Sequence, residues 1–197
     1  FQRAQPFGGV WGSAPRTPST ASETVFMPIA VVAEKPSVAR DLARVLGAER
    51  SAQGYLHGNN WVVTWAIGHL VALADPGTID PDWKAWRLDR LPMIPRQWPT
   101  VVPDAVAAQY RLVERILNGP RIESIVCATD AGREGELIFR MIYEASGCTK
   151  PVRRLWISSL TEEAIRDGFD RLRPGADFDA LADAARARSR ADWLVGM

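Results

Sequence analysis

The sequence predicts an α/β fold in which a mostly parallel sheet is flanked by helices. Three short runs with strand-like apolar content cover residues 28–33, 122–128 and 152–157. Each run precedes a segment with the apolar spacing of an amphipathic helix. Alternation of apolar strands with helices is typical of parallel sheets that are buried on both faces.

The first strand, over residues 28–33, leads into a helix predicted over residues 38–46, whose valines and leucines recur at helical spacing. We expect Ser37 to cap the start of this helix and Gly47 to end it. Residues 55–66 then read as a two-stranded hairpin, since strand-like runs flank a pair of asparagines.

Two tryptophans of this hairpin, Trp61 and Trp65, lie four positions apart. Residues at even spacing share one face of a strand, so we expect both rings to pack into the core. Residues 75–103 contain six prolines and no clear apolar period. This segment is predicted to be a long irregular excursion.

Besides the helix that follows the second strand, the second half of the chain is predicted to hold helices over residues 104–117, 160–172 and 177–197. The last helix has no capping signal, which indicates that the sequence is cut inside a domain. Residues 1–26 are rich in Gly, Pro, Ser and Thr without apolar periodicity. We expect them to form a disordered extension, with Met27 as an alternative natural start.

Composition places the chain among ordinary globular proteins, with 47% hydrophobic residues, 24% charged residues and a net charge of +1. No apolar stretch reaches the ~20 residues that a membrane-spanning helix needs. The two cysteines, Cys127 and Cys148, do not form a disulfide framework, which favours a reducing interior and hence the cytoplasm.

The most informative stretch is residues 129–136, which follow the second strand and open a helix. It holds the acids Asp130, Glu134 and Glu136 together with Arg133. Mg²⁺ is usually bound by one or two carboxylates, with water and phosphate oxygens in the remaining positions. The stretch therefore predicts a magnesium site beside a phosphate, with Glu136 outside the first set of ligands or facing solvent.

A second acid, Glu34, follows the first strand. If the two strands are neighbours in a parallel sheet, Glu34 and Asp130 meet at its carboxyl edge, where such folds bind ligands. Lys35 and Arg133 would supply positive charge for a phosphate. The alternative is that each acid merely stabilises a helix N-terminus, by ~0.3–1 kcal/mol.

Four blocks of this sequence resemble type IA DNA topoisomerases, and bacterial topoisomerase III in particular. They occur in the same order along residues 28–197 and are residues 33–39, Gly68-His69-Leu70, residues 128–138 and residues 187–196. The resemblance implies a Toprim (Rossmann-like) domain over residues 27–175. It also implies that residues 176–197 begin the next, helical domain.

The resemblance further implies roles for individual residues. Glu34 looks like the Toprim glutamate that binds metal and moves a proton, and Lys35 like the lysine that contacts the cleaved phosphate. Asp130 and Glu134 look like the first and last acids of an Asp-x-Asp-x-Glu metal motif, and Arg133 like its accompanying arginine.

His69, Arg188 and Asp192 look like positions near bound single-stranded DNA. The cofactor implied is Mg²⁺, and the implied activity is ATP-independent cleavage, passage and rejoining of single DNA strands. A monomer in the bacterial cytoplasm, associated with the nucleoid, is expected.

Two departures from the family pattern stand out. Gly132 occupies the middle acid position, so a second metal ion is doubtful. The family's nucleophilic tyrosine lies in a later domain, and the surroundings of Tyr55, Tyr110 and Tyr143 do not match it. The segment alone is therefore expected to be inactive. A catalytically silent DNA-binding module and a Toprim domain of a primase or nuclease remain alternatives.

Overall fold

A computed structural model describes residues 27–196 of the chain. The predicted extension, residues 1–26, lies outside this range. Within it, the main sheet has the strand order β2-β3-β4-β1-β7-β8-β9. The strands of this sheet are β1 (Ile29–Ala33), β2 (Arg50–Ala52), β3 (Tyr55–Gly58), β4 (Trp61–Trp65), β7 (Ile125–Ala128), β8 (Val152–Arg154) and β9 (Arg173–Pro174).

The centre of the sheet is parallel and its edges are antiparallel. Strand β1 pairs in parallel with both β4 and β7, and β7 pairs in parallel with β8. At one edge β2, β3 and β4 form an antiparallel meander, and at the other β9 pairs antiparallel with β8. The predicted α/β class is confirmed, with a mixed sheet whose parallel pairings lie at its centre.

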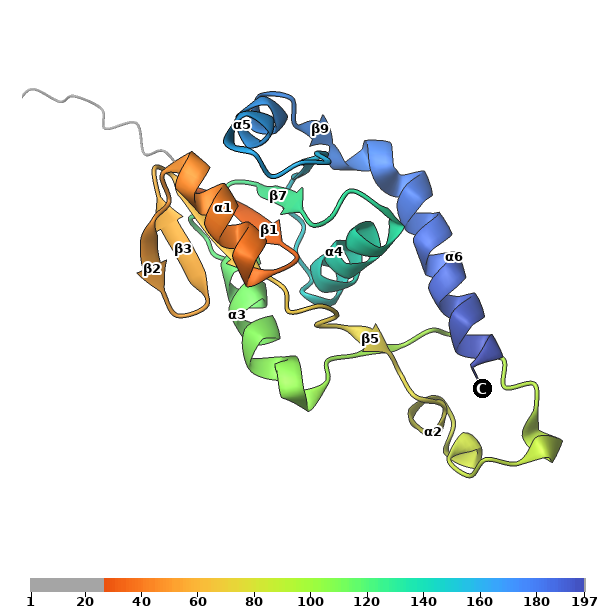
Figure 1. Ribbon diagram of the computed structural model, residues 1–197. Coiled ribbons are helices and arrows are strands. Elements are labelled where there is room, and N and C mark those ends of the chain that lie inside the picture. The colour runs from red at the N-terminus through yellow and green to blue at the C-terminus, as the bar shows by residue number, and fades with distance from the viewer. Residues whose placement is uncertain (1–26, 197) are drawn as a thin grey trace, which may run out of the picture.

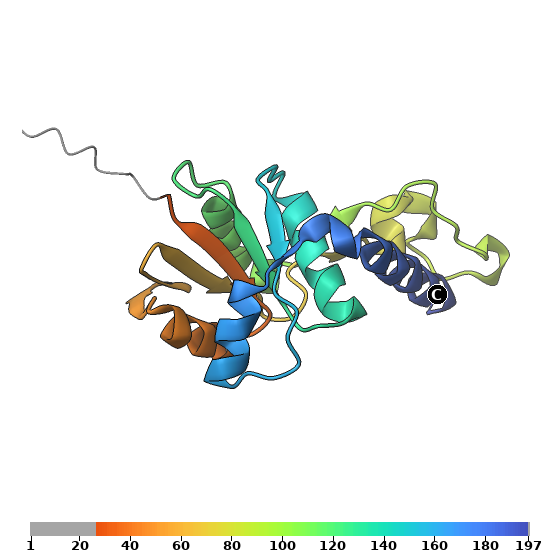
Figure 2. The same cartoon turned by 90° about the horizontal axis from the view of Figure 1, so that it is seen from above.

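Helices cover both faces of the sheet (Figures 1 and 2). The α-helices are α1 (Pro36–Leu46), α2 (Pro76–Ile79), α3 (Ala107–Leu117), α4 (Arg133–Ala145), α5 (Glu162–Asp170) and α6 (Asp179–Val195). Short 3₁₀ turns cover Pro81–Trp83, Leu88–Arg90, Asp104–Val106 and Gly175–Phe178. None of the helices in the described range is both long and apolar enough to cross a bilayer.

The core has two halves because successive side chains of a strand point to opposite faces of the sheet. Ala30 and Val32 of β1 join a cluster with apolar residues of α3 and α4. Val31 and Ala33 join a second cluster with residues of α1 and Ile165 of α5. These four of the five β1 residues have no exposed surface, as expected for the central strand of a sheet covered on both sides.

The predicted hairpin is the pair β3 and β4. Its turn residues, Asn59 and Asn60, have φ of 44° and 65°, the left-handed region that asparagine tolerates in two-residue hairpins. Trp61 and Trp65 both pack on the cluster that includes α1, and the Trp61 ring meets Phe169 edge-on, with centroids 5.3 Å apart. The predicted shared face is confirmed.

Several boundaries differ from the prediction. Helix α1 begins at Pro36, with Lys35 as its N-cap residue, so the prediction of Ser37 as the cap is wrong. Proline suits the first helical position because its ring already holds a helical φ, and the helix starts two residues before the predicted residue 38. The ending at Gly47 is confirmed, with φ of 69°.

Two predicted strands are shorter than expected: β7 begins at Ile125, and β8 ends at Arg154. The amide of Leu155 still donates to the Cys127 carbonyl, but Trp156 then leaves the sheet and stacks on Phe178, with centroids 5.0 Å apart. Aromatic packing outside the sheet therefore ends this strand.

The predicted excursion leaves and rejoins the fold through a small second sheet, β5 (Ala72–Leu73) and β6 (Thr100–Val101). Between these strands it forms only short helical turns and extends away from the main sheet beside the end of α6 (Figure 1). The Trp193 indole N–H donates to the Ala74 carbonyl at 3.0 Å and anchors α6 to the base of the excursion.

Candidate cation and phosphate site

Glu34 and Asp130 lie side by side where two neighbouring parallel strands end. The register of β1 and β7 places Ala33 opposite Ala128, so the residues that follow leave the sheet at the same edge. The backbone N–H of Asp130 donates to Glu34 Oε2 at 3.2 Å. Glu34 is only 8% exposed, whereas the Asp130 side chain is 59% exposed. The Glu34 carboxylate is thus buried, whereas the Asp130 carboxylate is open to solvent.

Lys35 lies between these two carboxylates. Its Nζ atom is 3.3 Å from Glu34 Oε1 and 3.5 Å from Asp130 Oδ2. The pKa of Lys35 is raised above its ordinary value, chiefly by the hydrogen bond to Glu34 and by the charges of Glu34 and Asp130. The lysine is therefore cationic at neutral pH, and both carboxylates face one positive charge.

The turn between β7 and α4 brings the helix start very close to Asp130. A Cβ atom added at Gly135 would lie 2.2 Å from the Asp130 carbonyl oxygen, so only glycine fits there without movement. Gly132, the N-cap residue of α4, differs, because a Cβ added there meets nothing within 4 Å. The middle acid position of the family pattern is thus filled by glycine although a side chain would fit.

Glu134 forms a pair with His69 instead of joining the other two acids. The His69 Nε2 and Glu134 Oε1 atoms are 2.6 Å apart, and both side chains are exposed. Within residues 27–196, no three His, Cys, Asp or Glu side chains converge closely enough to bind a metal ion. The chemistry present fits a cation held by the two carboxylates of Glu34 and Asp130, and Glu134 as a ligand remains a prediction.

The remaining predicted DNA contacts lie on two helices. Arg133 is the first residue of α4, and its side chain is exposed beside the acidic turn. Arg188 and Asp192 are exposed on α6 and pair with each other at 3.4 Å. They therefore belong to a different element from the ends of β1 and β7.

Asp130 also lines a hollow of about 310 Å³. Its walls come from α1, the turn after β7 and the segment after β8, including Val38, Leu42, Ser158 and Leu160. The hollow gives the exposed Asp130 carboxylate a concave and partly apolar neighbourhood.

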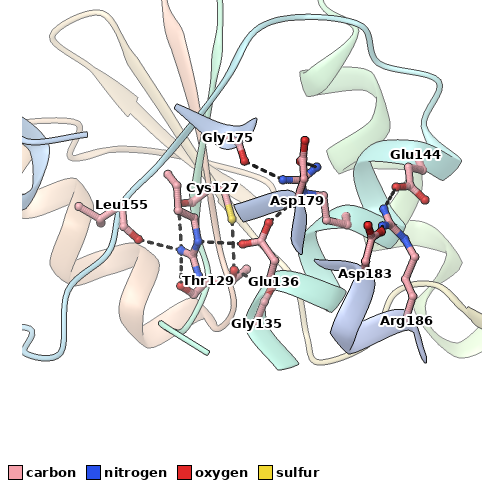
Figure 3. Close-up of polar contacts among 12 residues, drawn as sticks. Cys127, Thr129, Gly135, Glu136, Glu144, Leu155, Gly175, Asp179, Asp183 and Arg186 are labelled. Atoms are coloured by element: carbon pink, nitrogen blue, oxygen red, sulfur yellow. Dashed lines mark hydrogen bonds and ion pairs between the residues drawn. The ribbon is translucent and has the colours of Figure 1, made fainter. Parts of the chain in front are cut away.

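Behind the site lies a buried ionic network that the sequence patterns did not reveal (Figure 3). Arg154 and Glu136 are 1% and 2% exposed, and Arg154 Nε donates to Glu136 Oε2 at 3.0 Å. Of the two places expected for Glu136, the solvent-facing one is wrong because this side chain is buried. Glu136 and Arg154 each lie among further charged residues of their segments, so the sequence held no signal that singled out this pair.

The chain belongs to the Toprim domain family, whose model matches residues 29–160. The match covers the main sheet except β9, the turn after β7 and the acidic residues described above.

Among proteins of established name, the chain is similar to enzymes called DNA topoisomerase 3. It is 51% identical to the one from Shouchella clausii over 168 residues, which is 85% of this chain and 23% of that protein. It is also 51% identical to the one from Bacillus licheniformis over 167 residues, again 85% of this chain and 23% of that protein. The chain thus spans about a quarter of the length of these relatives, and the resemblance to type IA enzymes of the topoisomerase III kind is confirmed.

A solved structure shares the fold. Full-length topoisomerase I from Thermotoga maritima superposes with a TM-score of 0.58 at 20% identity, covering 84% of this chain and 24% of that chain.

Proposed function

We propose that this segment provides the Mg²⁺ and phosphate site of an ATP-independent type IA topoisomerase of the topoisomerase III kind. The observation that carries the proposal is the convergence of Glu34 and Asp130 on one positive charge, the Lys35 ammonium, at the carboxyl edge of the sheet. A pair of carboxylates with an open side suits Mg²⁺, which retains water and phosphate oxygens as its other ligands.

Glu34 and Asp130 would hold the cation, with Glu134 as a further ligand if it turned away from His69. A bound Mg²⁺ would offset the negative charge of the phosphate, an electrostatic contribution common in active sites. Lys35 and Arg133 would bind the phosphate oxygens, with Arg133 able to form a bidentate contact. Glu34 would hold or transfer a proton at the oxygen that leaves and later returns during cleavage and rejoining.

The substrate of this proposal is single-stranded DNA. His69 and Arg133 lie beside the acidic turn, and Arg188 and Asp192 lie along α6, so a strand contacting all four would cross from one helix to the other. The nucleophilic tyrosine belongs to the part of the relatives that lies beyond this segment. We expect a monomeric protein of the bacterial cytoplasm that acts near the nucleoid.

The proposal is tested by measuring DNA relaxation or decatenation by a full-length enzyme that carries this segment. Mg²⁺-dependent relaxation or decatenation of DNA is expected, with Glu34→Gln reducing it by at least two orders of magnitude. Surface variant Lys84→Met serves as the control, because Lys84 is exposed on the excursion. Full activity of Glu34→Gln would contradict the role given to Glu34.

A catalytically silent DNA-binding module is the second candidate, and Gly132 is the observation that favours it. Titration of the segment with Mn²⁺ as a probe distinguishes the two. A silent module predicts no specific binding and no difference between the wild type and Asp130→Asn. The catalytic proposal predicts saturable binding that Asp130→Asn weakens.

A further inference from the structure

Arg154 is a buried arginine whose side chain holds the exit of β7 in place. Its NH1 atom donates to the carbonyl oxygens of Cys127 at 3.2 Å and Thr129 at 2.8 Å, and to that of Leu155 at 2.8 Å. Its NH2 atom donates to the Asp130 carbonyl at 2.7 Å. A single guanidinium thus donates hydrogen bonds to three of the four backbone carbonyls of residues 127–130.

The charge of Arg154 is balanced inside the protein. Glu136 Oε2 accepts from Arg154 Nε, and Glu136 Oε1 accepts from Arg140 Nε at 2.8 Å. Arg140 also contacts the Gly175 carbonyl and, at 2.8 Å, Asp179 at the start of α6. Figure 3 shows this chain of contacts from the end of β7 to α6. Burial of a lone guanidinium would be costly, so the partner carboxylate is needed for Arg154 to remain there.

The peptide groups of Asp130 are therefore held from two sides. Its N–H donates to Glu34 Oε2, and its carbonyl accepts from Arg154. The start of α4 also lies close to this backbone, since a Cβ added at Gly135 would lie 2.2 Å from the Asp130 carbonyl oxygen. By contrast, the Asp130 carboxylate is 59% exposed, so packing around the side chain itself cannot fix its direction.

We infer that Arg154 is a positioning residue of the cation site: it fixes the Asp130 backbone so that the carboxylate converges with Glu34. The inference rests on the proposed function, since it assigns a role in binding the cation. Residues that orient metal ligands from behind commonly change metal affinity by 10–100-fold when replaced.

Arg154→Lys is the direct test, because it keeps the positive charge beside Glu136 but cannot reach several carbonyls at once. The probe is Mn²⁺ alone, with free Mn²⁺ measured by electron paramagnetic resonance at a temperature where each variant is folded by circular dichroism. We expect the affinity for Mn²⁺ to fall about tenfold. Arg140→Lys is the matched control: it changes the same network away from Asp130, and its affinity should stay within twofold of the wild type.

The results separate this inference from the proposed function. If the wild-type chain does not bind Mn²⁺ and Asp130→Asn behaves in the same way, both the inference and the proposed function are overturned. Saturable binding that Asp130→Asn weakens and Arg154→Lys does not would overturn the role of Arg154 alone. An equal loss in Arg154→Lys and Arg140→Lys would also overturn it, since the effect would then follow from loss of the network in general.

If Arg154→Lys does not fold, the Mn²⁺ affinity of Glu136→Gln tests the inference instead. This variant keeps the shape of Glu136 and a neutral acceptor for Arg154 but removes the charge that holds the guanidinium. A severalfold loss of Mn²⁺ affinity in folded Glu136→Gln that Arg140→Lys does not share supports the inference, and unchanged affinity in Glu136→Gln, or an equal loss in both variants, overturns it.

Discussion

Asp130 donates its backbone N–H to the buried carboxylate of Glu34 at 3.2 Å, across 96 positions of sequence. The bond links the ends of two parallel strands and leaves the second oxygen of Glu34 facing Lys35. A carboxylate that accepts a main-chain N–H on one oxygen and a cation on the other has a defined orientation. The predictions below follow from this arrangement and from the packing that supports it.

Replacing Lys35 should tighten the binding of a metal ion by the isolated segment. The Lys35 ammonium occupies the space between Glu34 and Asp130, so it competes with an added cation. In Lys35→Met we expect roughly two- to fivefold tighter binding of Mn²⁺, the range expected for an exposed ion pair. Isothermal titration calorimetry measures this, with the exposed Lys84→Met as control. Weaker binding in Lys35→Met would show that the lysine assists the metal instead of competing with it.

Gly135→Ala should destabilise the fold although alanine favours helices. The added Cβ would lie 2.2 Å from the Asp130 carbonyl oxygen and 2.8 Å from its nitrogen, so backbone must move. Overpacking of this kind costs about 1–3 kcal/mol. Gly132→Ala is the matched control, because its Cβ meets nothing within 4 Å and its φ of −176° suits any residue. Urea denaturation of both variants gives the comparison, and equal midpoints would contradict the close approach.

Alkaline pH should reduce stability partly through Cys127. Burial raises the pKa of this thiol from 9.0 to about 11. The unfolded chain therefore loses the proton at lower pH than the folded chain does. The stability that the protonated Cys127 thiol contributes is fully present below about pH 9 and is lost as the pH rises to about 11. Urea denaturation under reducing conditions should show a smaller loss across this range in Cys127→Ala than in the wild type. Parallel pH profiles for the two proteins would refute the contribution of Cys127.

Trp193→Phe should loosen the end of α6. The substitution retains a ring near Trp98, whose centroid is 5.4 Å from that of Trp193, but removes the indole N–H that reaches the Ala74 carbonyl. Loss of such a hydrogen bond costs about 1 kcal/mol. Amide hydrogen exchange should become faster in the last turns of α6 and remain unchanged in α3. Trp86→Phe is the control, because that ring is 65% exposed. Unchanged exchange in Trp193→Phe would mean that the anchor contributes nothing to α6.

Much of the site was predictable because parallel strands end at one edge of a sheet. Apolar runs located β1 and β7, and the residues that follow them, Glu34 and Asp130, had to lie near each other once these strands paired. Local capping was less predictable. Pro36 and Ser37 are both good starts for a helix, and only the backbone decided in favour of Pro36.

The Arg154–Glu136 pair could not be predicted from hydrophobic pattern. Such patterns place charged residues at the surface, whereas these two neutralise each other inside the protein. Their burial depends on β8 and α4 packing together, and that information is absent from either segment alone.

The sequence by itself determined the alternation of strands and helices, the acids at the ends of two strands and the membership of the Toprim family, since these depend on local order along the chain. Only the tertiary structure decided that Lys35 bridges Glu34 and Asp130, that Glu134 pairs with His69 across 65 positions, and that Arg154 holds Asp130 from behind. The physical reason is that the direction of a side chain depends on which distant segments pack against it, and packing is a property of the whole fold.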